Sequence, residues 1–142
     1  MAENIEVKLR LTDLAGMAFE GETPTGHKVL LDAAEEVGGQ DLGPRPVHLL
    51  LVCLGACTGM DVLSILRKMR QPVAGYEIEV IGERAEEHPK KYLRITIKHS
   101  IIGAIASDKL ARAIELSDQT YCSVAANLRG VTEIISQYEI RP

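Results

Sequence analysis

Apolar and polar residues alternate strictly at the start of the chain. Over residues 4–12 (NIEVKLRLT), every second side chain is apolar and those between are polar or charged. Because successive side chains of a strand point to opposite faces, this period of two predicts a half-buried β-strand. Two further strand patterns follow at residues 16–22 and 27–33, separated by the strong turn signal TPTG. This part of the chain therefore predicts three consecutive antiparallel strands.

A long apolar stretch occupies residues 43–70. Its first residues include Pro44 and Pro46, and prolines suit the first turn of a helix, where the missing N–H would be unpaired anyway. Over residues 49–60 almost every side chain is apolar or small, so we expect a helix that is covered on all sides. The unbroken apolar run falls short of the roughly 18 residues of a membrane span. The pattern predicts a buried helix in a protein that does not enter a membrane.

The second half of the chain returns to strands and then mixes them with helices. Residues 76–84 and 92–102 have a period of two and flank the polar turn EEHPK, which predicts a hairpin. An amphipathic helix is expected from Ser107, followed by a short helix over residues 122–128 and a last strand over residues 131–140. This order of elements predicts an α+β protein that forms a single domain over its 142 residues.

Charge and composition narrow the possible functions. The 16 basic and 20 acidic residues give a net charge of -4 and are scattered along the chain, so a basic patch for nucleic acid is not expected. The start MAENIEVKLR is unlike an apolar leader, which predicts a cytoplasmic protein. A helix covered on all sides is unusual in a chain of this length. A second copy of the chain could supply the missing cover.

Three cysteines are the first candidates for chemistry. An odd number without framework spacing favours buried, metal-bound or reactive thiols over structural disulfides. Cys57, deep inside the central helix, is either a small core residue or a nucleophile whose thiolate needs a nearby cation. Cys122 is either a small core residue or a nucleophile or leaving group, because it stands beside a predicted helix start, an environment that can lower a thiol pKa; Ser123 is a possible cap. Cys53 lies four residues before Cys57, where a disulfide would be strained, so we expect it in the core.

The cation that activates Cys57 would have to come from a basic residue elsewhere in the fold. His48 lies nine residues before Cys57, which is half a rotation of a helix, so we expect it near a thiol only through a second copy of the chain. Asp61 fits a bond to a backbone group or a lysine as well as a role in catalysis. The cysteines and a histidine lack the short ligand spacing typical of zinc, so a metal is not expected. The candidate cations are Arg10, Arg45, Arg84 and His88.

Three segments together resemble the OsmC/Ohr family of osmotically inducible and organic hydroperoxide resistance proteins, in particular its uncharacterised OsmC-like branch. They are GPRPVHLLLVCLGACTGMDVLSILRKMR, GERAEEHP and AIELSDQTYCSVAANL. The resemblance implies curved antiparallel sheets around a long buried central helix, in an intertwined homodimer. It also implies a peroxidase cycle that defends against oxidative stress and needs no cofactor. Cys57 attacks an organic hydroperoxide and becomes a sulfenic acid, Cys122 resolves it as a disulfide, and a dithiol such as a dihydrolipoyl protein restores both thiols.

Two positions depart from the pattern of the family's hydroperoxide reductases. Their glutamate near the start of the central helix is replaced by VH at residues 47–48, and the arginine of an early strand is missing from LAGMAFEGE at residues 14–22. Either Arg10, Arg45 or Arg84 takes the place of that arginine, or the thiol is less activated. The alternative function is a non-enzymatic dimer that binds a small apolar or acyl ligand, with cysteines that are structural or act as redox sensors.

Overall fold

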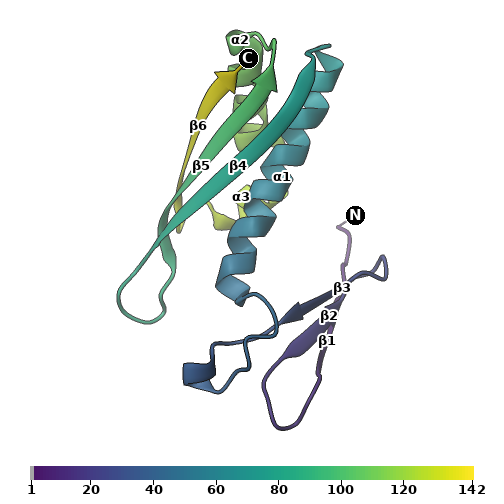
Figure 1. The fold of residues 1–142 in the computed structure, drawn as a ribbon, viewed down its shortest axis with the longest axis vertical. Helices are drawn as coiled ribbons and strands as arrows, with labels where there is room; N and C mark the ends of the chain where they lie inside the picture. The colour runs from purple at the N-terminus through teal and green to yellow at the C-terminus, as the bar shows by residue number, and fades with distance from the viewer. Residues whose placement is uncertain (1) are drawn as a thin grey trace. The chain divides into compact units, whose positions relative to one another are not determined.

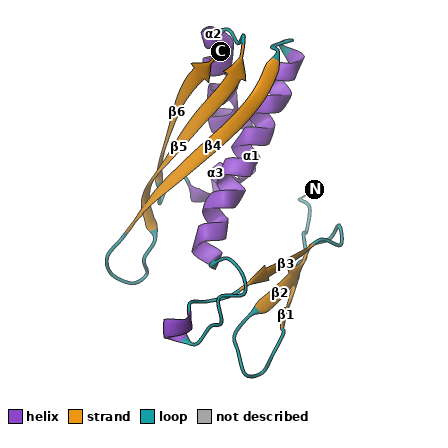
Figure 2. Cartoon of the chain, in the orientation of Figure 1, coloured by secondary structure: helices purple, strands orange, loops and turns teal. Residues whose placement is uncertain are grey.

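The computed structural model of the chain describes residues 2–142. These form two compact units, which meet in the sequence between Leu50 and Leu51. The helices and strands of both units confirm the α+β class (Figures 1 and 2); the single domain stays a prediction. The elements are β1 (Lys8–Leu11), β2 (Phe19–Glu22), β3 (Lys28–Leu31), η1 (Glu35–Val37), α1 (Pro46–Lys68), β4 (Val73–Arg84), β5 (Tyr92–Gly103), α2 (Ser107–Leu116), η2 (Ser117–Tyr121), α3 (Ser123–Leu128) and β6 (Glu133–Arg141).

The first unit contains an antiparallel sheet in the order β1-β2-β3. This confirms the three consecutive strands, although each has four residues and is shorter than its sequence pattern. The prediction that the first strand is half buried is wrong for the single chain. Ile5, Val7 and Leu9 keep 69%, 56% and 59% of their surface exposed. Their apolar face is therefore available to another protein surface.

A loop held by Asp32 connects the first sheet to α1. The carboxylate of Asp32 is buried and accepts hydrogen bonds from the backbone N–H groups of Ala33, Gln40 and Leu42, at 2.7, 3.1 and 3.1 Å. Burial acts to raise the pKa of Asp32, but the three N–H donors outweigh it and lower the pKa. Asp32 is therefore ionised near neutral pH and fixes the path of the loop. The helix that follows begins at Pro46, as the sequence predicts.

The second unit contains a three-stranded sheet in the order β4-β5-β6 (Figure 1). The antiparallel pairing of β4 with β5 confirms the predicted hairpin. The last strand, β6, pairs with β5 in parallel. The sheet is therefore mixed, whereas the family resemblance implied antiparallel sheets. Two helices and η2 connect β5 to β6, and a connection of this length is what a parallel pair requires.

The core of the second unit lies between this sheet and the helices. Two glycines let α1 approach β4 closely. A Cβ at Gly55 would lie 2.9 Å from Cγ2 of Val80, and a Cβ at Gly59 would lie 2.7 Å from Cδ1 of Ile78. Side chains of α1, β5, α2 and the β5–α2 loop meet in one cluster: Val62, Leu66, Ile101, Ile105, Leu110, Ala113 and Ile114.

Within the single chain, α1 is covered on one side, and cover of the other side by a second copy stays a prediction. Val52 and Met60 keep 61% and 71% of their surface exposed. The helix has 23 residues and includes an 18-residue window with a mean hydropathy of 2.1, so by length and composition it could cross a membrane. The opposite side of α1 packs against the sheet of its own chain, and we therefore treat it as a core helix.

Candidate active site

Two of the three cysteines meet in the second unit. Cys57 lies on α1, and Cys122 is the residue directly before α3 and caps its N-terminus. Asp61 lies one turn after Cys57, so the two side chains share a face of α1. The two Sγ atoms and a carboxylate oxygen of Asp61 all lie within 4.8 Å of one another. The fold thus brings together two thiols that are far apart in the sequence and adds a carboxylate.

A chain of hydrogen bonds orients this carboxylate. The hydroxyl of Ser117, in η2, donates to Oδ2 of Asp61 at 2.9 Å. The hydroxyl oxygens of Thr58 and Ser117 lie 2.9 Å apart. Because the proton of Ser117 is used by Asp61, we infer that Thr58 donates to Ser117. Both hydroxyl residues are fully buried, so they hold the carboxylate in a fixed orientation beside the thiols.

The environment of Cys122 raises the pKa of its thiol. Burial is the largest cause, the nearby Cys57 and the charge of Asp61 act in the same direction, and together they raise the pKa of Cys122 to about 11. The N–H of Ala125 donates to Sγ of Cys122 at 3.4 Å and acts to lower the pKa, but it does not offset the other effects. The predicted lowering of this pKa is therefore wrong. The predicted cap at Ser123 is also displaced, because Cys122 is itself the cap.

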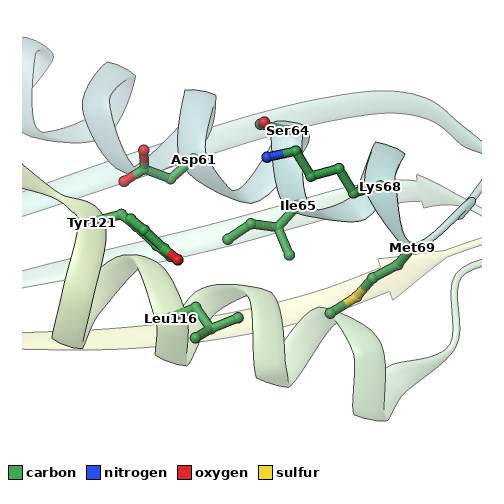
Figure 3. A pocket seen from close by; sticks show the side chains of 7 residues that line it. All are labelled: Asp61, Ser64, Ile65, Lys68, Met69, Leu116 and Tyr121. Atoms are coloured by element: carbon green, nitrogen blue, oxygen red, sulfur yellow. The ribbon is translucent and has the colours of Figure 1, made fainter.

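A pocket of about 370 Å³ opens beside Asp61. In Figure 3, Asp61 on α1 and Tyr121 on η2 lie at one end of it, and the side chain of Lys68 extends from the other end back along α1. Apolar side chains of Ile65 and Leu116 line the space between them. Asp61 therefore belongs both to the thiol cluster and to a pocket that suits a small apolar molecule.

The basic residues predicted in the first unit have carboxylate partners or are exposed. Arg10 forms an ion pair with Glu20 at 3.0 Å, and Arg45 forms one with Asp41 at 2.6 Å. His48 is exposed in the first turn of α1. All three lie before Leu51 and so outside the unit that contains both thiols. Their part in activating Cys57 stays a prediction.

The basic residues predicted in the second unit lie at the β4–β5 hairpin. Arg84 donates from Nε to the backbone oxygen of Lys90 at 2.9 Å. His88 is exposed in the same turn. That either of them activates Cys57 also stays a prediction. Cys53, expected in the core, is exposed in the single chain.

The sequence interpretation gave no role to Thr58 and Ser117. Thr58 directly follows Cys57, and Ser117 lies where the helical pattern after α2 loosens, in a segment that forms the π-helical turn η2. Such turns often mark functional sites, so the loosened pattern was a usable signal. The partner of Ser117 could not be read from the sequence, because the bond to Asp61 joins residues that are distant along the chain.

Comparisons with known proteins agree on one family. A family model described as OsmC-like protein matches residues 38–136. Protein YhfA of Escherichia coli K12 is 35% identical over 135 residues, which cover 94% of this chain and 98% of YhfA. The crystal structure of a hypothetical protein from Aquifex aeolicus VF5 is 36% identical, with a TM-score of 0.85 over 99% of this chain and 98% of that one.

A more distant structure shares the fold. The organic hydroperoxide resistance protein OsmC from Legionella pneumophila is 13% identical, with a TM-score of 0.71 over 98% of each chain. The family model spans most of this chain and includes both thiols of the cluster. The chain belongs to the family of OsmC-like proteins.

Proposed function

We propose that this protein is a thiol peroxidase that reduces organic hydroperoxides in defence against oxidative stress. The observation that carries the proposal is the position of the Cys57 and Cys122 sulfurs, within 4.8 Å of each other and of Asp61, a residue that also lines a pocket of about 370 Å³. Two thiols at this distance can pass through a sulfenic acid to a disulfide. The organic hydroperoxide resistance protein from Legionella pneumophila, which has the same fold, supports the choice of substrate class.

The exposure of the two thiols and the raised pKa of Cys122 support different roles for them. Cys57 is partly exposed, whereas Cys122 is buried with a raised pKa. We therefore assign the attack on the peroxide to Cys57. Its sulfur takes the terminal oxygen of the hydroperoxide, the O–O bond breaks, and an alcohol leaves. The products of this step are a sulfenic acid on Cys57 and the alcohol.

Cys122 then resolves the sulfenic acid. Its sulfur bonds to the sulfur of Cys57, its proton and the sulfenic hydroxyl leave as water, and a disulfide is formed. A disulfide requires a sulfur–sulfur distance of about 2.05 Å, so the two atoms approach by at most about 2.8 Å from their limit of 4.8 Å. Asp61, whose carboxylate oxygen lies within 4.8 Å of the Cys122 sulfur, can take this proton and pass it to the departing hydroxyl. A dithiol, such as a dihydrolipoyl group on a partner protein, returns both cysteines to thiols.

The exposed apolar side of α1 supports a homodimer in the cytoplasm. Val52, Ala56 and Met60 lie four residues apart along the helix and are all exposed in the single chain. Their stripe is the surface expected to pack against the same helix of a second copy. A location in the cytoplasm, which is a reducing compartment, suits a cycle in which a dithiol returns both cysteines to thiols.

The test is the rate of peroxide consumption in the presence of a dithiol. Wild type and two variants are compared with an aryl-alkyl hydroperoxide as substrate and dihydrolipoamide as donor. Cys57→Ser is expected to reduce the rate to that of the donor alone, whereas Cys53→Ser, on the same helix, is expected to keep the wild-type rate. Equal rates for Cys57→Ser and wild type would contradict the proposed function.

A second candidate is a non-enzymatic dimer that binds a small apolar or acyl ligand. The observation in its favour is the carboxylate of Asp61 beside both thiols, because a negative charge disfavours a reactive thiolate. Mass spectrometry after mild peroxide treatment separates the two candidates. A prompt loss of two hydrogen atoms at Cys57 and Cys122 supports the peroxidase, whereas unmodified cysteines together with a bound acyl ligand in native spectra support the binding protein.

A further inference from the structure

We propose that the reduced protein binds Zn²⁺ or a similar divalent transition-metal cation between Cys57, Cys122 and Asp61. The inference does not depend on the peroxidase. The three donor atoms already lie within 4.8 Å of one another. In a tetrahedral zinc site, bond lengths of about 2.3 Å to sulfur and about 2.1 Å to oxygen place two sulfurs about 3.8 Å apart and a sulfur and an oxygen about 3.6 Å apart. Each pair of donors therefore needs to approach by about 1.2 Å at most.

The types of donor select the metal. Two thiolates and one carboxylate match Zn²⁺ and its relatives Co²⁺ and Cd²⁺, whereas Mg²⁺ and Ca²⁺ prefer sites built from oxygen alone. Three protein ligands leave the fourth tetrahedral position for water, as in open zinc sites. Asp61 also lines the pocket of about 370 Å³, so solvent and ions reach the cluster from that side.

The neighbours of Asp61 orient it as a metal ligand would require. Ser117 donates to one carboxylate oxygen, Oδ2, at 2.9 Å and leaves the other oxygen available. The hydroxyl oxygen of Thr58 in turn lies 2.9 Å from the hydroxyl oxygen of Ser117. Hydrogen bonds of this kind fix the geometry of metal ligands. At known metal sites, removing such a bond lowers the metal affinity by roughly 10- to 100-fold. The buried pair Thr58 and Ser117 therefore preorganises the third ligand.

Metal binding and disulfide formation exclude each other. On binding, each thiol that becomes a ligand loses its proton to solvent, and two metal–sulfur bonds form without any change of oxidation state. On oxidation, the same two sulfurs bond to each other and no thiolate is left. A bound cation therefore blocks the thiols reversibly, and a dithiol oxidant expels it.

The test is a competition with a chromophoric chelator on freshly reduced protein. One Zn²⁺ per chain is expected for the wild type and for the control Cys53→Ser. The Asp61→Asn variant is expected to bind at least about tenfold more weakly, and Cys57→Ser and Cys122→Ser to lose the site. With Co²⁺ as the probe, the near-ultraviolet thiolate-to-metal absorption is expected in the wild type and in Cys53→Ser, and is expected to be absent from Cys57→Ser and Cys122→Ser.

A second arm avoids substitutions altogether. Wild-type protein oxidised with an azo oxidant, which takes up the two thiol hydrogens as a hydrazine, is expected to release its Zn²⁺ and to bind it again after reduction. Unchanged Zn²⁺ binding by the oxidised protein, or by Asp61→Asn, would overturn the proposal. Peroxide consumption measured in chelated buffer is independent of both arms, so failure of the peroxidase and failure of the metal site are distinguishable.

Discussion

A buried histidine in the central strand of the second sheet is expected to make the free energy of unfolding depend on pH. His99 is fully buried on β5, and its Nδ1 lies 2.5 Å from the hydroxyl oxygen of Tyr76. Its Nε2 has no hydrogen-bond partner among the residues that the structure describes. Burial lowers the pKa of His99 from 6.5 to about 4. The side chain is therefore neutral in the folded protein throughout the physiological range.

The sign and size of the effect follow from this difference in pKa. When the pH falls from 6.5 toward 4, the unfolded chain takes up a proton at His99 that the folded protein does not bind. The stability contributed by the neutral histidine is thus complete above the unfolded pKa and is lost as the pH falls to the folded pKa. A pKa difference of about 2.5 corresponds to roughly 3 kcal/mol in full, of which about 2 kcal/mol is lost at about pH 5.

The assay is urea unfolding at a fixed protein concentration, at about pH 7.5 and about pH 5. His99→Gln is the matched variant, because its amide can bond to the Tyr76 hydroxyl but does not titrate. The wild type is expected to lose about 2 kcal/mol more than the variant between the two pH values. Asp118, whose pKa is raised by burial, is present in both proteins and cancels in the comparison. An equal loss in both proteins would refute the reasoning.

Three further predictions concern the thiols, the dimer and the core. Cys122→Ser is expected to lose catalytic turnover and to consume one equivalent of peroxide for each oxygen atom that mass spectra show on Cys57, because nothing resolves the sulfenic acid and excess peroxide oxidises it further. Met60→Asp, at a side chain with 71% of its surface exposed on α1, is expected to shift the protein toward monomer in sedimentation velocity if α1 forms the dimer contact. Leu66→Ala, at a fully buried position, is expected to lower the free energy of unfolding by about 2–5 kcal/mol in urea titrations.

Local patterns in the sequence were sufficient for most of the elements. The proline at residue 46 predicts the start of α1, and the period of two predicts the β4–β5 hairpin, because both signals depend on neighbouring residues. The parallel pairing of β6 was not predictable in the same way. It depends on the direction in which α2 and α3 return the chain to the sheet, and that direction is decided by packing.

The candidate site, too, was predictable from the sequence only where the signal was local. The sequence nominated Cys57 and Cys122, and the spacing of Cys57 and Asp61 by four residues indicates a shared helix face. The raised pKa of Cys122 was not predictable, because it depends on burial and on Asp61, a residue from another element. A position beside a helix start suggests a lowered pKa only where the thiol remains accessible to solvent.

The negative charge of Asp61 opposes deprotonation of the two thiols beside it. Two thiolates beside an ionised carboxylate would place three negative charges within 4.8 Å, which the buried surroundings of Cys122 disfavour strongly. A proton on Cys122 relieves this repulsion, and so does a divalent cation shared by all three donors. The proposed peroxide reduction uses the first solution, because in it Cys122 gives up its proton only when it attacks the sulfenic acid. Metal binding uses the second, so the same carboxylate that restrains the free thiolates completes the site for a cation.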